Sequence, residues 1–359
     1  LLGIMIFIGV LISSLSDDKP VALAGNSILM LTLDKPIYDR APDDPFSSMD
    51  IAGMSSRRDI GLNEILRCIE KAKTDEKIKG IYLKLSSIHA GIATVDEIRE
   101  ALVDFKSSGK FLIAYADVFT HKSYFLATAS DKIYMNPEGN FLFTGLSSEV
   151  MFLKGALDKL GIEAQIIRHG KYKSAVELYS ETQMSKESRE QISSYISSIW
   201  NHMLHKIHLS RKLEINTLEQ LANGLKVKNA AEALQNHMID SAIYKDELIH
   251  ILSNLSGNKN DKLNLTSLVE YSKTLQMDNA AEKIAVIYAQ GTINMSGEMD
   301  EKNISAEKLA VTLREARNDS SIKAIVLRIN SPGGSALASE VIWREVYLAA
   351  KAKPVITSM

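Results

Sequence analysis

The sequence predicts an α/β fold made of two copies of one repeating unit, and three observations lead to that prediction. Residues 78–87 (IKGIYLKLSS) and residues 322–331 (IKAIVLRINS) are identical at five of ten positions. Each of these apolar stretches lies between two helix-like stretches, and a further apolar stretch stands at each end of the unit. Strands that are apolar throughout and alternate with helices are typical of a parallel sheet covered by helices on both faces.

The first copy is expected to read strand, helix, strand, helix, strand. Its first strand and first helix are predicted in SILMLTLDKPI and LNEILRCIEKAKTDE, and its third strand is predicted in GKFLIAYA. The second helix is predicted from apolar residues at helical spacing, namely Val95, Ile98, Leu102 and Phe105.

The second copy repeats this order. KIAVIYAQGTI and AKPVITSM are its outer strands, and AEKLAVTLREARNDS is its first helix. Ile342, Val346 and Ala349 recur at helical spacing in its second helix. The sequence stops at Met359 on the third strand, so the second copy is expected to be incomplete.

Four segments are predicted along the chain. Residues 1–15 carry no charge and are expected to be a truncated transmembrane anchor, with a cleaved signal peptide as the alternative. Residues 16–255 are assigned to the first repeat with a helical extension, 256–280 to a linker that includes the polar SGNKNDKLN, and 281–359 to the start of the second repeat. In the extension, Ser185 is expected to cap a helix whose apolar face is formed by Ile192, Ile196, Ile199, Met203 and Ile207.

The composition excludes several classes of protein. A formal net charge of −2 without a basic cluster argues against nucleic-acid binding. The single cysteine, Cys68, excludes an internal disulfide and a cysteine-rich metal site, and it is expected to be a small core residue. His202, His205 and His208 lie at spacings of three on one helix, but no fourth ligand is apparent, so solvated polar positions are the favoured interpretation.

The segment Ser331-Pro332-Gly333-Gly334 follows the strand at 322–331 and leaves two interpretations open. It could be a simple Pro-Gly turn. Alternatively, adjacent N–H groups between a strand and a helix could stabilise a developing oxyanion. The first copy has Ser87-Ile88-His89-Ala90 at this place, so the fold does not require the glycines, which favours a function confined to the second copy.

The segment RHGKYKSAVELYS, residues 168–180, follows a strand-like AQIIR and contains Lys171 and Lys173. A desolvated lysine loses its proton easily and can act as general base for a serine nucleophile. Spacing alone does not distinguish Lys173 from an ordinary solvated lysine.

RINSPGGSALASEVIWREV, KPVITSM, YKSAVE, SDKIYMNPEG and the apolar N-terminus together resemble the long, two-repeat form of the signal peptide peptidase A (protease IV) family. The resemblance implies tandem ClpP/crotonase-like repeats and a homotetramer. It also implies a single-pass protein of the bacterial inner membrane whose soluble part lies on the extracytoplasmic side. Its substrates would be released signal peptides, hydrolysed by a Ser–Lys dyad without metal or organic cofactor.

The family resemblance assigns the general base to Lys173 and the oxyanion hole to Gly333 and Gly334. The family's nucleophile follows the strand that here ends in KPVITSM, so it is expected beyond Met359, and the sequence as given is expected to be inactive. In the first copy Lys122 lies about where a nucleophile would stand, with Ser123 beside it, but that copy lacks the glycines. A crotonase-type acyl-CoA enzyme and a non-catalytic membrane scaffold are the alternatives.

Overall fold

The computed structural model describes residues 23–41, 60–276, 280–297, 299 and 302–359. The chain divides into two compact units, the first comprising Leu1–Lys84, Ile88–Leu112 and Ile249–Met359 and the second Leu85–Ser87 and Ile113–Leu248. The predicted membrane anchor, residues 1–15, lies outside the described residues. In the part of the chain that is described, no helix is both long and apolar enough to cross a membrane.

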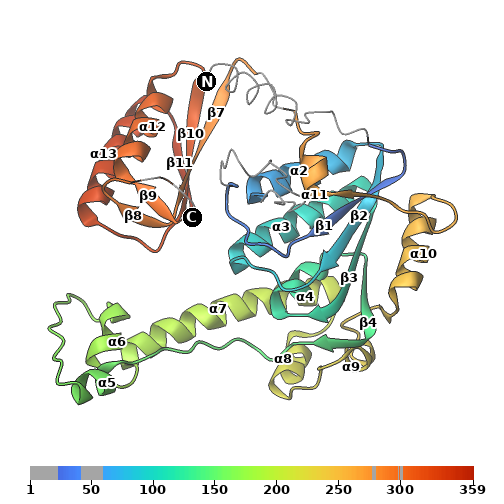
Figure 1. The fold of residues 1–359 in the computed structure, drawn as a ribbon, viewed down its shortest axis with the longest axis horizontal. Coiled ribbons are helices and arrows are strands. Elements are labelled where there is room, and N and C mark those ends of the chain that lie inside the picture. Colours follow the sequence, from blue (N-terminus) through green and yellow to red (C-terminus); the bar gives the residue numbers. More distant parts are fainter. Residues whose placement is uncertain (1–22, 42–59, 277–279, 298, 300–301) are drawn as a thin grey trace, which may run out of the picture. The chain divides into compact units, whose positions relative to one another are not determined.

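The first unit holds three parallel strands of the first repeat in the order β2–β1–β6 (Figure 1). The neighbouring residues Ile28 and Leu29 are both fully buried, and they point to opposite faces of β1. Both faces of this strand are therefore covered, as the sequence predicts. The elements are β1 (Ser27–Thr32), α2 (Leu62–Thr74), β2 (Ile78–Leu85), α3 (Ile92–Phe105), η1 (Lys106–Ser108), α10 (Lys245–Ser256), β6 (Asn264–Ser267) and α11 (Leu268–Ser272).

The segment 256–280, expected to be a linker, contributes to the first repeat. Its strand β6 pairs with β1 in parallel, with Asn264 opposite Ser27. Its helix α11 is fastened to the end of α2, because the hydroxyl of Tyr271 donates a hydrogen bond of 3.0 Å to Asp75. Residues 257–263 form the surface loop that the polar SGNKNDKLN predicts.

The second repeat also lies in the first unit and follows the predicted order. Its strands run parallel in the order β11–β10–β7, and a separate pair of short parallel strands is formed by β8 and β9. The elements are β7 (Lys283–Gln290), β8 (Thr292–Asn294), β9 (Asn303–Ser305), α12 (Ala306–Asn318), β10 (Ile322–Asn330), α13 (Ala336–Ala352) and β11 (Val355–Ser358).

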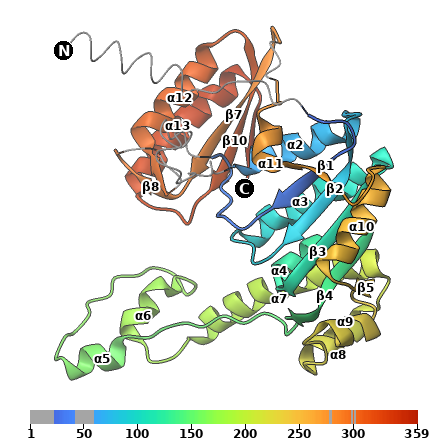
Figure 2. The same cartoon turned by 45° about the vertical axis from the view of Figure 1, so that its right-hand side comes forward.

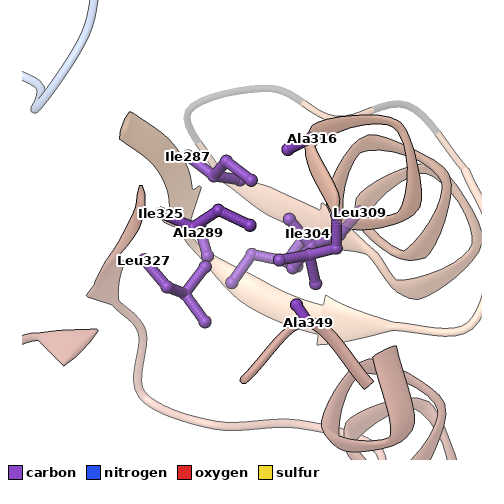
Figure 3. Packing of buried hydrophobic residues seen from close by; sticks show 9 residues of the cluster. Ile287, Ala289, Ile304, Leu309, Ala316, Ile325, Leu327 and Ala349 are labelled. Carbon is purple, nitrogen blue, oxygen red and sulfur yellow. The ribbon is translucent and has the colours of Figure 1, made fainter. Parts of the chain in front are cut away.

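Helices α12 and α13 pack together on one face of this three-stranded sheet (Figures 1 and 2). Figure 3 shows the apolar side chains that lie between the sheet and these helices. They include Ile325 and Leu327 from the sheet and Leu309 and Ala349 from the helices. Every second residue of β7 points the other way, and Ile284 on that face is 65% exposed. Helices α12 and α13 thus share one face of the described part of this sheet, and on the other face Arg328 of β10 donates a hydrogen bond of 2.9 Å to Glu97 of α3.

The second unit contains three parallel strands in the order β5–β4–β3, followed by a helical extension. Residues 164–168, predicted to be a strand, form none, and Ile167 is 99% exposed. An apolar run forms a strand only where a neighbouring strand accepts its hydrogen bonds. The elements are β3 (Phe111–Phe119), α4 (His121–Ala127), β4 (Lys132–Phe141), α5 (Lys154–Lys159), η2 (Ser174–Val176), α6 (Glu177–Ser180), α7 (Lys186–Arg211), α8 (Ile215–Asn223), α9 (Ala230–Gln235) and β5 (Ser241–Ala242).

Helix α7 begins after Ser185, as predicted, and the Ser185 side chain accepts a hydrogen bond from the N–H of Ser188. Of its predicted apolar face, Met203 and Ile207 are buried. The earlier members of that face are only half-buried. The N-terminal half of α7 extends away from the strands of its own unit, and α5 and α6 lie beside it (Figure 2).

Candidate active site

The turn at residues 331–334 joins β10 to α13 and contains both predicted oxyanion-hole glycines. Gly333 has a φ of +105°, a backbone conformation that a residue with a side chain rarely adopts. The helix that follows begins with a cap, because the hydroxyl of Ser335 accepts a hydrogen bond of 3.3 Å from the N–H of Ala338. Pro332 and Gly333 therefore form a turn that depends on the backbone conformation of a glycine at position 333.

Gly334 is required for a different reason, which is the close approach of another backbone segment. Ile293 on β8 pairs with Gly334 in a parallel bridge. The N–H of Ile293 donates to the carbonyl of Gly333 at 3.0 Å, and the N–H of Ser335 donates to the carbonyl of Ile293 at 2.9 Å. A β-carbon on Gly334 would lie 2.1 Å from that carbonyl oxygen. No side chain fits there without moving β8.

The two glycine N–H groups differ in their hydrogen bonding. The N–H of Gly333 donates to the hydroxyl of Ser331 at 3.0 Å, and that hydroxyl donates to the carbonyl of Gly291 at 2.6 Å. The N–H of Gly334 has no hydrogen-bond acceptor among the described residues, and Gly334 is exposed. The turn therefore presents an open backbone donor to solvent, the N–H of Gly334.

Gly291 completes the turn from the neighbouring strand. It follows β7 directly, has a φ of +98°, and donates its N–H to the carbonyl of Asn330 at 2.9 Å. A β-carbon on Gly291 would lie 2.1 Å from the carbonyl oxygen of Lys302. The second repeat thus uses three glycines, Gly291, Gly333 and Gly334, to bring three backbone segments together.

The equivalent turn of the first repeat is closed by an apolar residue. Ile88, at the place of the proline, is 4% exposed, and the carbonyl of His89 accepts a hydrogen bond of 3.2 Å from the N–H of Ile37. This turn has neither the glycines nor the conformation that they permit. The difference between the copies that the sequence predicts is therefore present in the backbone.

Lys173, the predicted general base, lies in the second unit on the loop between α5 and η2. It directly precedes η2 and is exposed, as is Lys171. Large apolar side chains between α5 and Lys173 in the sequence are exposed as well: Leu160 is 72%, Ile162 51%, Ile167 99% and Tyr172 52% exposed. The lysine and the two glycines thus belong to different units.

Glu177, four residues after Lys173, is the buried member of this segment and is 2% exposed. Its carboxylate accepts hydrogen bonds from the hydroxyl of Ser185 at 2.6 Å, from the Ser185 N–H at 3.2 Å, and from Arg168 at 3.3 Å. The hydroxyl of Ser185, then its N–H, and after them Arg168 hold the pKa of Glu177 below its ordinary value. A charged Glu177 therefore closes the loop and fastens it to the start of α7.

Ser123 of the first repeat has a structural role. It is fully buried and forms a capping box with Thr120: the hydroxyl of Ser123 accepts the Thr120 N–H at 2.8 Å, and its own N–H donates to the Thr120 hydroxyl at 3.3 Å. A serine engaged in this way starts helix α4. It has no open side toward a substrate.

The histidines of α7 form no metal site. The rings of His205 and His208 are 6.4 Å apart, and Nδ1 of His208 lies 2.8 Å from the carbonyl of Leu213. In the described ranges, no group of three or more His, Cys, Asp or Glu side chains is arranged to hold a metal ion.

Comparison with known families matches residues 104–259 to peptidase family S49. The matched residues run from the end of α3 to the loop after α10. The chain is also 34% identical to protease 4 of Haemophilus influenzae over 99% of its own length and 60% of that relative. It is 33% identical to the chloroplastic serine protease SPPA of Arabidopsis thaliana, over 85% of this chain and 46% of the relative. Protease 4 of Salmonella typhi is 34% identical, over 86% of this chain and 52% of the relative. The chain thus spans about half the length of these curated relatives.

The S49 match includes Lys173, Glu177 and Ser185, whereas the glycine turn lies beyond the matched residues. Sequence reasoning missed Glu177 and Gly291, and it gave Ser331 no role beyond its place in the turn. Gly291 carried a signal, since a glycine directly after an apolar strand indicates a close backbone approach. Glu177 carried none, because a glutamate in a polar segment is expected to be solvated.

Proposed function

We propose that this chain is part of a membrane-bound serine endopeptidase that hydrolyses released signal peptides with a Ser–Lys dyad. The S49 match and the relatives named protease 4 support a serine peptidase with peptide substrates. The observation that carries the proposal is the glycine turn, which offers an open N–H in the repeat where the family places its oxyanion hole. ClpP/crotonase-like repeats and an extracytoplasmic location at the bacterial inner membrane belong to the same proposal.

In the proposed reaction, Lys173 accepts the proton of a serine hydroxyl, and the serine oxygen attacks the carbonyl carbon of a peptide bond. That serine lies outside the present sequence. The carbonyl oxygen becomes an oxyanion, which accepts the N–H of Gly334. The N–H of Gly333 can contribute only after it leaves the hydroxyl of Ser331.

The bond to the leaving amine then breaks, and the amine takes its proton from Lys173. Water hydrolyses the acyl-enzyme ester, again with Lys173 as base, and the serine is regenerated. No step needs a metal ion or an organic cofactor.

A lysine acts as a general base only where water is excluded from it, because desolvation favours the uncharged amine. Lys173 is exposed within this chain, so the proposal requires that another surface covers it. The exposed apolar residues of the same loop, including Ile162 and Ile167, support assembly with further copies, and we propose the homotetramer that the family resemblance implies. Sedimentation of the full-length protein measures this directly.

The proposed role of Lys173 as general base is tested by Lys173→Ala in the full-length protein, with Lys171→Ala as the matched control. Both lysines are exposed and lie two residues apart on one loop. Loss of a general base costs about 10²- to 10⁴-fold in turnover. We expect such a loss in peptide hydrolysis for Lys173→Ala and little change for Lys171→Ala. Equal effects of the two substitutions would contradict the assignment.

A further inference from the structure

The loop that carries Lys173 is closed at its base by an ion pair. Arg168 and Glu177 stand five residues before and four residues after Lys173, and their side chains approach within 3.3 Å. Glu177 has a nearly buried side chain, whereas the Arg168 side chain is 37% exposed. The pair brings the two ends of a ten-residue segment together, with the lysine near its middle.

The same carboxylate joins the loop to the long helix α7. One oxygen of Glu177 accepts the hydroxyl of Ser185 and the other accepts the Ser185 N–H, so both oxygens are engaged on the residue that begins α7. A buried carboxylate that loses such partners is left with the full cost of its desolvation. The joint is therefore stable while Glu177 is charged.

The hydroxyl of Ser185 serves the loop and the helix at once. It has a single proton, which it donates to Glu177 at 2.6 Å, and its oxygen accepts the N–H of Ser188 at 3.1 Å. The first turn of α7 and the loop are thus connected through one oxygen atom. A second and weaker contact lies beside the lysine, where the Tyr172 hydroxyl is 3.4 Å from Glu190 on the same helix.

We propose that Glu177 is a positioning residue that fixes Lys173 in space by fastening its loop to the N-terminus of α7. The proposal rests on the proposed role of Lys173 as general base. A helix of 26 residues is a stiff support, whereas an exposed loop without an anchor samples many conformations. A misplacement of about 1 Å of a catalytic group can cost about 100-fold in rate. The anchor therefore acts on turnover and not on substrate affinity.

The first experiment compares Glu177→Ala with Glu181→Ala in the full-length protein. Glu181 is exposed, lies four residues further along, and has no side-chain partner among the described residues, so it is a matched control. We expect Glu177→Ala to lower kcat about 10- to 100-fold with KM unchanged within about two-fold. Glu177→Gln, which retains one acceptor for the Ser185 hydroxyl, is expected to recover part of the loss. A kcat equal to that of the control would overturn the proposal.

A second pair of variants separates the anchor from the helix cap. Ser185→Asp retains an acceptor that caps α7 well, but it places a second carboxylate against Glu177. Ser185→Ala loses the cap and the hydroxyl contact to Glu177 together. If anchoring matters, both variants lower kcat. In the double variant with Glu177→Ala, the effects are less than additive, because the residues act through one contact. If only the cap matters, Ser185→Asp is as active as the unsubstituted protein, and the proposal fails.

The rate of amide hydrogen exchange at residues 171–176 tests whether Glu177 anchors the loop, independently of catalysis. We expect exchange in this segment to accelerate at least ten-fold in Glu177→Ala, with exchange unchanged in the buried half of α7 near Met203. If Lys173→Ala retains full activity while Glu177→Ala accelerates exchange, the base assignment fails and the anchor stands. Unchanged exchange in Glu177→Ala refutes the anchor whatever the activity.

Discussion

The carbonyl oxygen of Ile293 lies 2.1 Å from the point where a β-carbon on Gly334 would stand. That oxygen already accepts the N–H of Ser335 at 2.9 Å, so it is held in place by the bridge between β8 and the turn. The absence of a side chain at Gly334 thus permits the contact, and the contact in turn leaves the Gly334 N–H open to solvent. The shape of the turn and its candidate chemistry have the same cause.

Gly334→Ala is expected to destabilise the second repeat and to abolish peptide hydrolysis by the full-length protein. The new methyl group would overlap the Ile293 carbonyl, which is backbone and cannot rotate away. Forcing an extra carbon into such a contact costs about 1–3 kcal/mol. Chemical unfolding measures the loss. Gly155→Ala is the control, since nothing lies within 4 Å of its β-carbon and an alanine favours helix α5. A Gly334→Ala protein as stable as the control would contradict the geometry.

Gly333→Ala is expected to destabilise the second repeat through backbone strain alone. Its β-carbon meets nothing within 4 Å, but its φ of +105° is unfavourable for any residue with a side chain. The cost of such a conformation is about 1–3 kcal/mol. The bridge to Ile293 has no steric reason to break in this variant. The Ser335 amide should therefore stay protected from hydrogen exchange in Gly333→Ala and lose protection in Gly334→Ala, and equal protection in both variants would contradict the distinction.

Much of the second repeat could be predicted from the sequence, because its signals are local. The apolar run at 322–331 became β10, and the spacing of Ile342, Val346 and Ala349 became α13. Likewise, Ser185 was identified as a helix cap from residue type and position alone. Propensity and periodicity act over a few residues, and a single sequence contains them.

The contacts that shape the site could not be predicted, because they join residues far apart in sequence. Gly334 meets Ile293 across 41 positions, and the hydroxyl of Ser331 meets Gly291 across 40. The same limit explains the error at residues 164–168, where an apolar run has no strand beside it. It also explains why Glu177 was not recognised as a buried anchor.

Cys68 is expected to resist alkylation in the folded protein. It is fully buried on α2, and burial raises the pKa of its thiol from 9.0 to about 12. Only the thiolate reacts with the alkylating reagent. A rise of three pKa units lowers the thiolate population at pH 8 about a thousand-fold, and burial adds steric protection. It is the single cysteine of the sequence, so labelling followed by mass spectrometry is unambiguous. Full labelling in denaturant and none in buffer is the expected result, and rapid labelling of the native protein would refute the burial.

The contribution of Glu177 to stability is expected to depend on pH in a definite direction. The Ser185 hydroxyl and Arg168 lower the pKa of Glu177 in the folded state relative to the unfolded chain. Glu177 therefore contributes its full stabilisation at pH values above the ordinary carboxyl pKa. This stabilisation is lost as the pH falls through the lowered pKa of the folded state. The difference in exchange of residues 171–176 between the unsubstituted protein and Glu177→Gln should be largest at neutral pH and vanish in acid. A difference that grows on acidification would reverse the sign and contradict the charged anchor.

Glu345 is expected to contribute strongly to the packing of α12 against α13. Its side chain is 10% exposed, and its two oxygens bind Arg314 at 2.7 Å and Arg317 at 3.0 Å, both on α12. Hydrogen bonds to charged groups contribute about 1.5–3 kcal/mol each where they are buried, and the half-exposed Arg314 places its share at the lower end. Glu345→Gln should therefore lower the free energy of unfolding by about 1–3 kcal/mol, measured from the denaturant midpoint. Glu340→Gln, at an exposed position of the same helix, should change it by less than about 0.5 kcal/mol. Equal midpoints for the two variants would mean that these ion pairs add nothing to the packing of the two helices.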